Sequence, residues 1–265
     1  MTSRKLNGSV EKPALINKFL PPPLRPGNSK TGETMGTWSR AAGLSCPGKS
    51  EPCWDRCYGR KAHYHNPSVI NRLAINEAMW QQRNFVARVT AQILMSDIRT
   101  VRIHAVGDFD SPEYIQKWID IVARNKKTTF LCYTRSWSQP ELLPLLRKLA
   151  KFDNFSMWFS CDKATGKPAN CVNAKRAYMA CEDTDVPRYR VDLFFRAGSR
   201  KQKMVKMADT LVCPAERTPT KTVTCAQCRI CVDRQDWLDQ QNAKLRAVPM
   251  KLYSIGKAQG VTTCE

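Results

Sequence analysis

The feature that most constrains the fold is a regular alternation of helix-like and strand-like segments between residues 67 and 195. Apolar residues that recur every three or four positions are the main basis for predicting helices at residues 67–96, 111–124, 139–152, 167–180 and 233–246. Runs of β-branched and aromatic residues predict strands at residues 101–109, 128–134, 155–160 and 189–195. Strands joined by helices form a parallel sheet with right-handed crossovers. We therefore predict an α/β fold with a parallel sheet, a (β/α) barrel or a partial TIM-like barrel.

The chain is predicted to form one domain between two extensions. Residues 1–45 are rich in Pro, Gly, Ser and Lys without a sustained period, and we predict an irregular basic N-terminal arm. Residues 46–246 are predicted to form a single barrel-like domain with Cys-rich loops at both ends of the chain. Residues 247–265 are predicted to be a C-terminal tail. A domain of this length can bury a substantial core.

Three cysteines near the C-terminal end, here called the tail triplet, follow each other at a period of three: Cys225, Cys228 and Cys231. Such a run folds back on itself, so that three thiolates can meet at one metal while a more distant cysteine closes the site. Soft thiolate ligands select zinc or iron–sulfur clusters. The alternative is buried apolar cysteines, which would have to fall at this spacing by chance.

A second set, here called the N-terminal group, lies in a loop rich in Pro and Gly: Cys46, Cys53 and Cys57. We predict that this loop lacks regular structure and wraps a metal site. The N-terminal group can hold a second cluster, or it can donate one ligand to a cluster shared with the tail triplet. Either arrangement would connect the two ends of the domain.

The spacing favours an iron–sulfur cluster over zinc. A structural zinc ribbon uses two Cys-x2-Cys knuckles, whereas a ferredoxin-type run ends with a fourth cysteine followed by proline. Cys46 and Cys213 are both followed by proline, so either can complete the tail triplet. We predict one or two 4Fe–4S clusters, with zinc as the alternative. Twelve cysteines without an export signal indicate a reducing cytoplasm.

The charge of the chain predicts an anionic partner. Lys and Arg number 43 against 23 Asp and Glu, a formal net charge of +20. Nucleic acid, DNA or RNA, is the expected partner, because cations contact phosphates and the interleaved Trp and Tyr residues can stack on bases. A solubilising charge without a partner is the alternative. No membrane association is expected, since no apolar run is long enough to span a bilayer. The predicted nucleic-acid contacts are Arg196, Arg200, Lys201, Lys203 and Lys206.

Polar residues at the ends of the predicted strands are the candidates for catalysis. In parallel α/β sheets, chemistry collects at the carboxyl ends of the strands. His104 and Asp108 follow the first predicted strand, and Arg135 follows the second. A polar residue at such a position is more often part of a capped turn than a catalyst, so the prediction depends on these residues sharing one edge of the sheet.

Three motifs in this order resemble the gene-product-eighty-eight-like proteins of phages and plasmids, over about residues 30–240. They are Cys46-x6-Cys53-x3-Cys57-Tyr, Arg102-x-His104-x2-Gly107-Asp108-Phe109, and Cys213-Pro followed by the tail triplet. The resemblance implies a mobile-element origin and a cysteine-rich, barrel-like protein without an assigned reaction. The layout is also distantly similar to radical S-adenosylmethionine barrels, whose Cys-x3-Cys-x2-Cys spacing is absent here.

We arrive at one leading hypothesis and two alternatives. The leading hypothesis is a 4Fe–4S protein of a mobile genetic element that binds nucleic acid, with regulation as one role. The first alternative is a cluster-dependent enzyme of the radical S-adenosylmethionine type that uses His104, Asp108 and Arg135. The second is an interaction protein that zinc stabilises.

Overall fold

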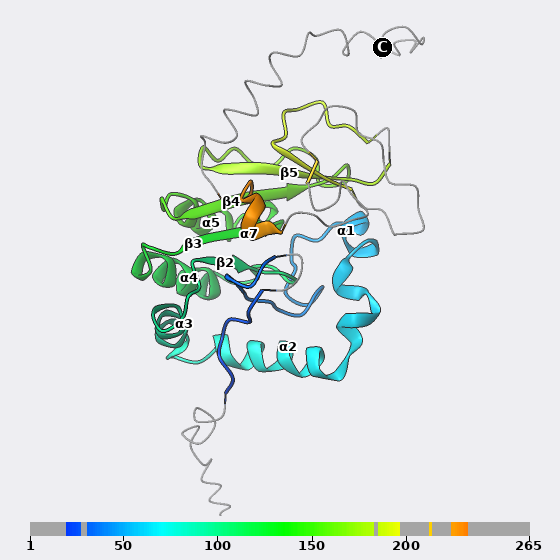
Figure 1. The fold of residues 1–265 in the computed structure, drawn as a ribbon. Coiled ribbons are helices and arrows are strands. Elements are labelled where there is room, and N and C mark those ends of the chain that lie inside the picture. Colours follow the sequence, from blue (N-terminus) through cyan, green and yellow to red (C-terminus); the bar gives the residue numbers. More distant parts are fainter. Residues whose placement is uncertain (1–19, 28–30, 183–184, 197–211, 214–223, 233–265) are drawn as a thin grey trace, which may run out of the picture.

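A six-stranded sheet, parallel throughout, forms the centre of the protein, and its strands lie side by side in the order of the sequence (Figure 1). The computed structural model describes residues 20–27, 31–182, 185–196, 212–213 and 224–232. The strands are β1 Met35–Thr37, β2 Thr100–Ile103, β3 Thr129–Thr134, β4 Phe155–Cys161, β5 Ala174–Ala180 and β6 Leu193–Arg196. β1 and β6 are the two edges, so the sheet is open.

The crossovers between strands carry most of the helices. The α-helices are α1 Glu51–Asp55, α2 Pro67–Trp80, α3 Phe85–Leu94, α4 Pro112–Arg124, α5 Leu143–Ala150 and α7 Cys225–Cys228. Short 3-10 helices lie at η2 Tyr58–Arg60, η3 Ala62–His65 and η4 Ser136–Ser138. Side-chain caps start several helices. Ser111 accepts a hydrogen bond from the Tyr114 N–H at the start of α4, and a proline occupies the first turn.

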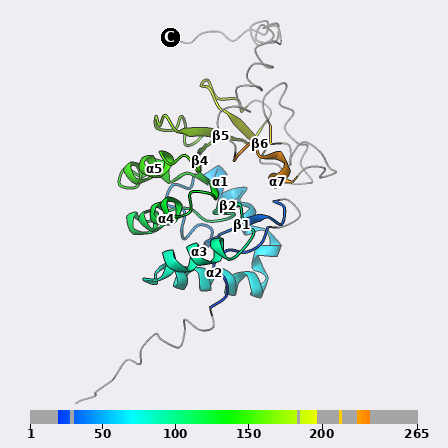
Figure 2. The same ribbon diagram turned by 60° about the vertical axis from the view of Figure 1, so that its left-hand side comes forward.

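The two faces of the sheet pack against different partners. Side chains such as Val101, Phe130 and Met157 point to one face and join the main core with α3, α4 and α5. The opposite face, here called the tail-covered face, carries Met35, Arg102, Leu131, Tyr133, Trp158 and Leu193. Figure 2 shows α3, α4 and α5 on one side of the sheet and α7 on the other. Residues 224–232 therefore cover a face that the crossover helices leave open.

The observed elements confirm the parallel α/β sheet but not a barrel, because the sheet is open. Helix α4 lies where it was predicted, whereas residues 67–96 form two helices with a break at Gln81–Asn84. The helix predicted at 167–180 is wrong: Ala174–Ala180 form β5, paired with β4 and β6. Pairing on both sides overrides the local preference of Ala and Lys for helix.

Two further elements were missed near the N-terminal group. β1 is short and contains Gly36, so it shows no alternation, yet it pairs with β2. The loop of the N-terminal group was predicted to be irregular, but it contains α1, which Ser50 caps through the Cys53 N–H. The predicted helix at 233–246 and the predicted tail at 247–265 lie outside the described residues. Within the described part, no helix is both long and apolar enough to cross a membrane.

Candidate metal centres

The tail segment, residues 224–232, folds back on itself through a short capped helix. Thr224 and Gln227 form a capping box at the start of α7, each side chain accepting a hydrogen bond from the other's backbone N–H. Arg229 ends α7 in the left-handed conformation, with φ at 53°. This turn brings Cys231 back toward the other two members of the tail triplet.

Two apolar side chains anchor the tail segment on the sheet. Ile230 packs with Trp158 and Leu193, and Val232 packs with Met35 and Leu131. Burying an aliphatic side chain of this size contributes about 1.5–3 kcal/mol. The Trp158 indole N–H also donates to the carbonyl oxygen of Cys231, at 2.9 Å. The tail segment is therefore held by packing and by a buried hydrogen bond.

Cys213 reaches the same place from the edge of the sheet. Val212 forms a parallel bridge with Phe194 of β6, and the Cys213 N–H donates to the Phe194 carbonyl at 3.0 Å. This pairing fixes Cys213, which is buried, beside the tail triplet. The question of which Cys-Pro pair lies with the triplet is thereby answered: it is Cys213, while Cys46 lies with Cys53 and Cys57.

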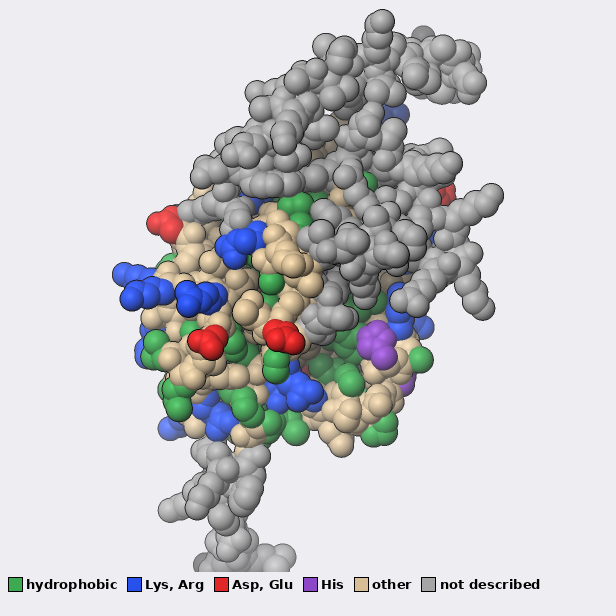
Figure 3. Space-filling model, in the orientation of Figure 1, with side chains coloured by type: hydrophobic (Ala, Val, Ile, Leu, Met, Phe, Trp, Pro, Cys, Tyr) green, Lys and Arg blue, Asp and Glu red, His purple; other side chains and the backbone are tan. Residues whose placement is uncertain are grey.

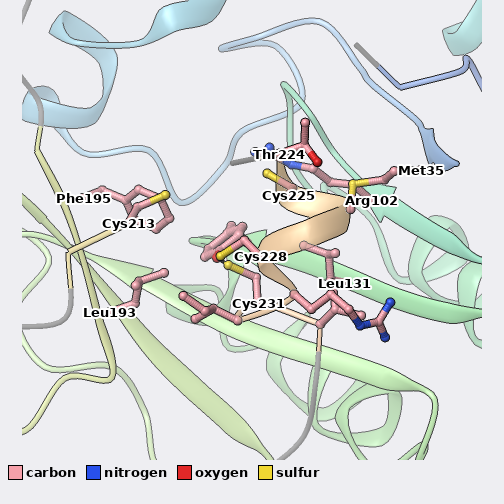
Figure 4. Close-up of a pocket in the computed structure, with 14 residues that line it drawn as sticks. Met35, Arg102, Leu131, Leu193, Phe195, Cys213, Thr224, Cys225, Cys228 and Cys231 are labelled. Carbon is pink, nitrogen blue, oxygen red and sulfur yellow. Dashed lines mark hydrogen bonds between the residues drawn. The ribbon is translucent and has the colours of Figure 1, made fainter. Parts of the chain in front are cut away.

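All four of these cysteines line one pocket on the tail-covered face, with a cavity of about 60 Å³. In Figure 4 the sulfur atoms of the tail triplet face a common space, and Cys213 enters it from the opposite side. We call Cys213 and the tail triplet the tail centre. The remaining lining residues are mostly apolar: Met35, Arg102, Leu131, Tyr133, Leu193, Phe195, Thr224, Arg229, Ile230 and Val232.

Burial favours the protonated forms of the thiols at the tail centre. Burial raises the pKa of Cys231 to about 12, and a hydrogen bond from the Tyr133 hydroxyl, at 2.7 Å from Sγ, acts in the opposite direction. Burial raises the pKa of Cys228 as well. Burial alone lowers the pKa of Arg102, but nearby phenols and the thiols of Cys225 and Cys231 raise it on balance. A cationic metal would favour the thiolate forms directly.

The N-terminal group lies at the carboxyl ends of the strands. Burial raises the pKa of Cys46 to about 12, and the charges of Asp108 and of the other two thiols act in the same direction. Burial also raises the pKa of Cys53, while the positive charge of Arg135 lowers it. All members of the group are half-buried free thiols. The group therefore occupies the edge where chemistry was predicted, separate from the tail centre.

A network of buried polar groups links this edge to the N-terminal group. Asp108 accepts hydrogen bonds from the Thr134 hydroxyl at 2.6 Å and from the Arg135 N–H at 2.8 Å. The Arg135 guanidinium forms an ion pair with Asp162 at 2.7 Å, and Asp162 also accepts from Ser50, the cap of α1. The ends of β2, β3 and β4 thus hold the helix that carries Cys53.

The catalytic candidates are only partly brought together. Asp108 and Arg135 share the network, and burial raises the pKa of Asp108 to about 6 against its hydrogen bonds. His104 lies apart from them: its Nε2 is 2.9 Å from the Tyr114 hydroxyl, and its φ is 62°. Burial holds the pKa of His104 well below 6.5, so the ring is neutral. His104 is part of the packing beneath α4.

The structure has no preformed site for a single metal ion in its described part, where no three His, Cys, Asp or Glu side chains are arranged to hold one. The predicted nucleic-acid contacts fall outside what is described: the Arg196 side chain and Arg200, Lys201, Lys203 and Lys206. On the face in Figure 3, the described Lys and Arg side chains lie singly or in small groups among neutral and acidic ones.

Sequence comparison identifies relatives across most of the chain. A family model described as Gene product 88 matches residues 19–234. The Gene 88 protein of Mycobacterium phage L5 is 25% identical over 205 residues, covering 72% of this chain and 79% of that protein. The Gene 88 protein of Mycobacterium phage D29 is 24% identical over 202 residues, with the same coverage. No solved structure matches this chain.

Proposed function

The chain belongs to the gene product 88 family of phage proteins, and we propose that it is an iron–sulfur protein whose 4Fe–4S cluster is bound by the tail centre. One observation carries the proposal: Cys213 and the tail triplet, which come from separate segments, line a single largely apolar pocket. Four thiolates are the usual ligands of such a cluster, and apolar walls limit the access of water to it.

The sequence spacing of the cysteines favours a cluster over zinc. A structural zinc ribbon uses two Cys-x2-Cys knuckles, whereas here three cysteines follow each other at a period of three. The fourth cysteine of the pocket, Cys213, is followed by proline, as in ferredoxin-type ligation.

The test is the metal content of protein purified without oxygen. We expect brown protein with about four irons and matching sulfide for one cluster. Cys228→Ser should lose this iron, whereas the matched control Cys171→Ser, at a half-buried cysteine outside both groups, should keep it. One zinc per chain without sulfide would reject the iron–sulfur proposal in favour of a zinc-stabilised interaction protein.

A cluster-dependent enzyme is the second candidate, and the position of the N-terminal group favours it. The group lies beside the Asp108, Arg135 and Asp162 network at the carboxyl ends of the strands. Three thiolates would leave one iron of a four-iron cluster without a protein ligand. The test is incubation of the reconstituted protein with S-adenosylmethionine and dithionite. Formation of deoxyadenosine that Cys53→Ser abolishes would support this function, and no cleavage would reject its radical version.

Nucleic acid is the partner that we propose from the net charge of +20. The expected result is binding that weakens steeply as salt rises, because phosphate contacts release counterions. A gel-shift or anisotropy titration at several salt concentrations measures this directly. Tight binding that is insensitive to salt would contradict phosphate-dominated recognition.

A further inference from the structure

Arg102 is a cation in an otherwise largely apolar part of the sheet. It lies on β2, where it is paired with Thr37 of β1 and Leu131 of β3. Its side chain lines the pocket that contains the tail centre, and its guanidinium carbon is 5.9 Å from the centre of the Tyr133 ring. Lys or Arg at the middle of a parallel sheet is unusual, since such strands are normally apolar.

The guanidinium of Arg102 has no anionic partner among the described residues. Its Nε is fully buried and has no hydrogen-bond acceptor there, and no carboxylate lies within ion-pair distance. Two other buried arginines differ from it. Arg40 pairs with Glu77 and Asp110 at 2.6 and 2.5 Å, and Arg135 pairs with Asp162 at 2.7 Å. An uncompensated cation in such a place is strongly destabilising.

The groups around Arg102 indicate which anion would compensate its charge. They are the phenols of Tyr58 and Tyr133 and the thiols of Cys225 and Cys231. The Tyr133 hydroxyl donates a hydrogen bond to Cys231 Sγ at 2.7 Å, so it is a neutral donor in this arrangement. The thiols, in contrast, become thiolates when they bind a metal. Four thiolates around a divalent metal core carry a net negative charge, and Arg102 lies on the wall of their pocket.

We propose that Arg102 is the counter-ion of the tail centre, neutralising part of the negative charge of the metal-bound thiolates. The inference rests on the proposed binding of a metal there, but it holds for a cluster and for zinc, because both are bound as thiolate complexes. The charge of Arg102 would then have two effects. It favours the reduced form of a cluster, since reduction adds a negative charge, and it slows loss of the metal.

The experiment compares Arg102→Gln and Arg102→Lys with the wild-type chain. Arg124→Gln is the matched control, because Arg124 is an exposed arginine at the end of α4, on the opposite side of the sheet. The midpoint potential of the iron form is measured by anaerobic titration, and metal loss is followed with a chelator. Circular dichroism checks that each variant is folded.

For Arg102→Gln we expect about a tenfold lower equilibrium constant for reduction, which is about 59 mV for a one-electron couple. Metal loss to the chelator should be faster as well. Arg102→Lys keeps the positive charge, so it should retain most of the wild-type midpoint potential and metal retention. Arg124→Gln should match the wild type in both. If Arg102→Gln does not fold, Arg102→Lys becomes the test, because it keeps the positive charge. Near wild-type potential and metal retention in folded Arg102→Lys would support the counter-ion role, and loss of both would contradict it.

Two kinds of failure are distinguishable. A metal-loaded Arg102→Gln protein with wild-type potential and wild-type metal retention would overturn the counter-ion role while leaving the iron–sulfur proposal intact. A wild-type chain that binds neither iron nor zinc at the tail centre would overturn both. Stabilisation of the metal-free chain by inorganic phosphate, lost in Arg102→Gln, would instead identify Arg102 as part of an anion site and would also overturn the proposal.

Discussion

The two cysteine groups differ in how the fold supports them. The tail centre lies on the tail-covered face, and Ile230 and Val232 anchor its segment by apolar burial. The N-terminal group lies at the strand ends, where charged and hydroxyl side chains hold α1 in place. An apolar enclosure with four thiols suits a closed structural or electron-transfer centre. A polar edge with three thiols suits an open site that a ligand can reach.

The largest expected effect tests this division of the cysteines. Cys213→Ser should abolish metal binding at the tail centre and lower the stability of the folded chain by several kcal/mol, because the binding energy of such a site is also folding energy. Cys46→Ser should leave the tail centre loaded, since Cys46 lies with the other group. Iron content and urea unfolding of both variants provide the measurement. Loss of all iron in each of the two variants would indicate one shared cluster.

The sequence was sufficient to predict a parallel sheet and its central strands, but not all six strands or how the two faces of the sheet are covered. Strong alternation over residues 101–160 located β2, β3, β4 and α4, because each has a clear apolar pattern. β5 was missed, since Ala174–Ala180 favour helix locally and become a strand only through their neighbours. The tail-covered face could not be predicted either, because it depends on contacts between residues distant in sequence.

The candidate metal site, too, was only partly predictable from the sequence. The spacing of the tail triplet identified its members, but the choice of Cys213 over Cys46 follows from the bridge between Val212 and Phe194, which leaves no local signal. Arg102 belongs to the Arg102-x-His104 motif, whose pattern does not indicate a role for the arginine. A charged residue between Val101 and Ile103, in a strand that is otherwise buried, was nevertheless a signal that this position faces something other than the main core.

The next largest effect is expected when the ion pair between Arg135 and Asp162 is broken, because this pair helps to hold α1 and the N-terminal group in place. Asp162→Asn should destabilise the fold by about 3–5 kcal/mol, because it leaves the buried Arg135 guanidinium without its carboxylate partner. The tail centre should remain loaded, since it does not depend on this pair. Urea unfolding gives the free energy, with the exposed Asp97→Asn as control. A change below about 1 kcal/mol, the value of an exposed pair, would show that the network is not a support.

The stability of the folded chain should also depend on pH, through Asp108 at the carboxyl ends of the strands. Its pKa is about 6 in the folded chain and 3.8 ordinarily, so the folded state binds the proton more tightly. The contribution of Asp108 to stability is therefore most favourable below about pH 4 and falls as pH rises to about 6, by about 3 kcal/mol at 1.36 kcal/mol per unit.

The measurement is the difference in free energy of unfolding between wild type and Asp108→Asn across this range. The lost hydrogen bond in the variant adds a constant offset, so only the slope reports the titration. A constant difference from pH 4 to pH 6 would mean that Asp108 does not titrate there. The tail centre has no carboxylate among its lining residues and should add no slope of this kind.

The smallest expected effect concerns the Tyr133 hydroxyl, which contacts the tail centre. Tyr133→Phe removes the hydrogen bond to Cys231 Sγ but keeps the ring that packs on Trp158. We expect a cost of about 0.5–1.5 kcal/mol in stability and a lower midpoint potential of the metal-loaded form, since hydrogen bonds to sulfur favour the reduced cluster. Tyr178→Phe, whose hydroxyl contacts Asp185 instead, controls for the loss of a buried phenol. If both variants keep the wild-type potential, the hydrogen bond from Tyr133 does not contribute to the potential of the tail centre.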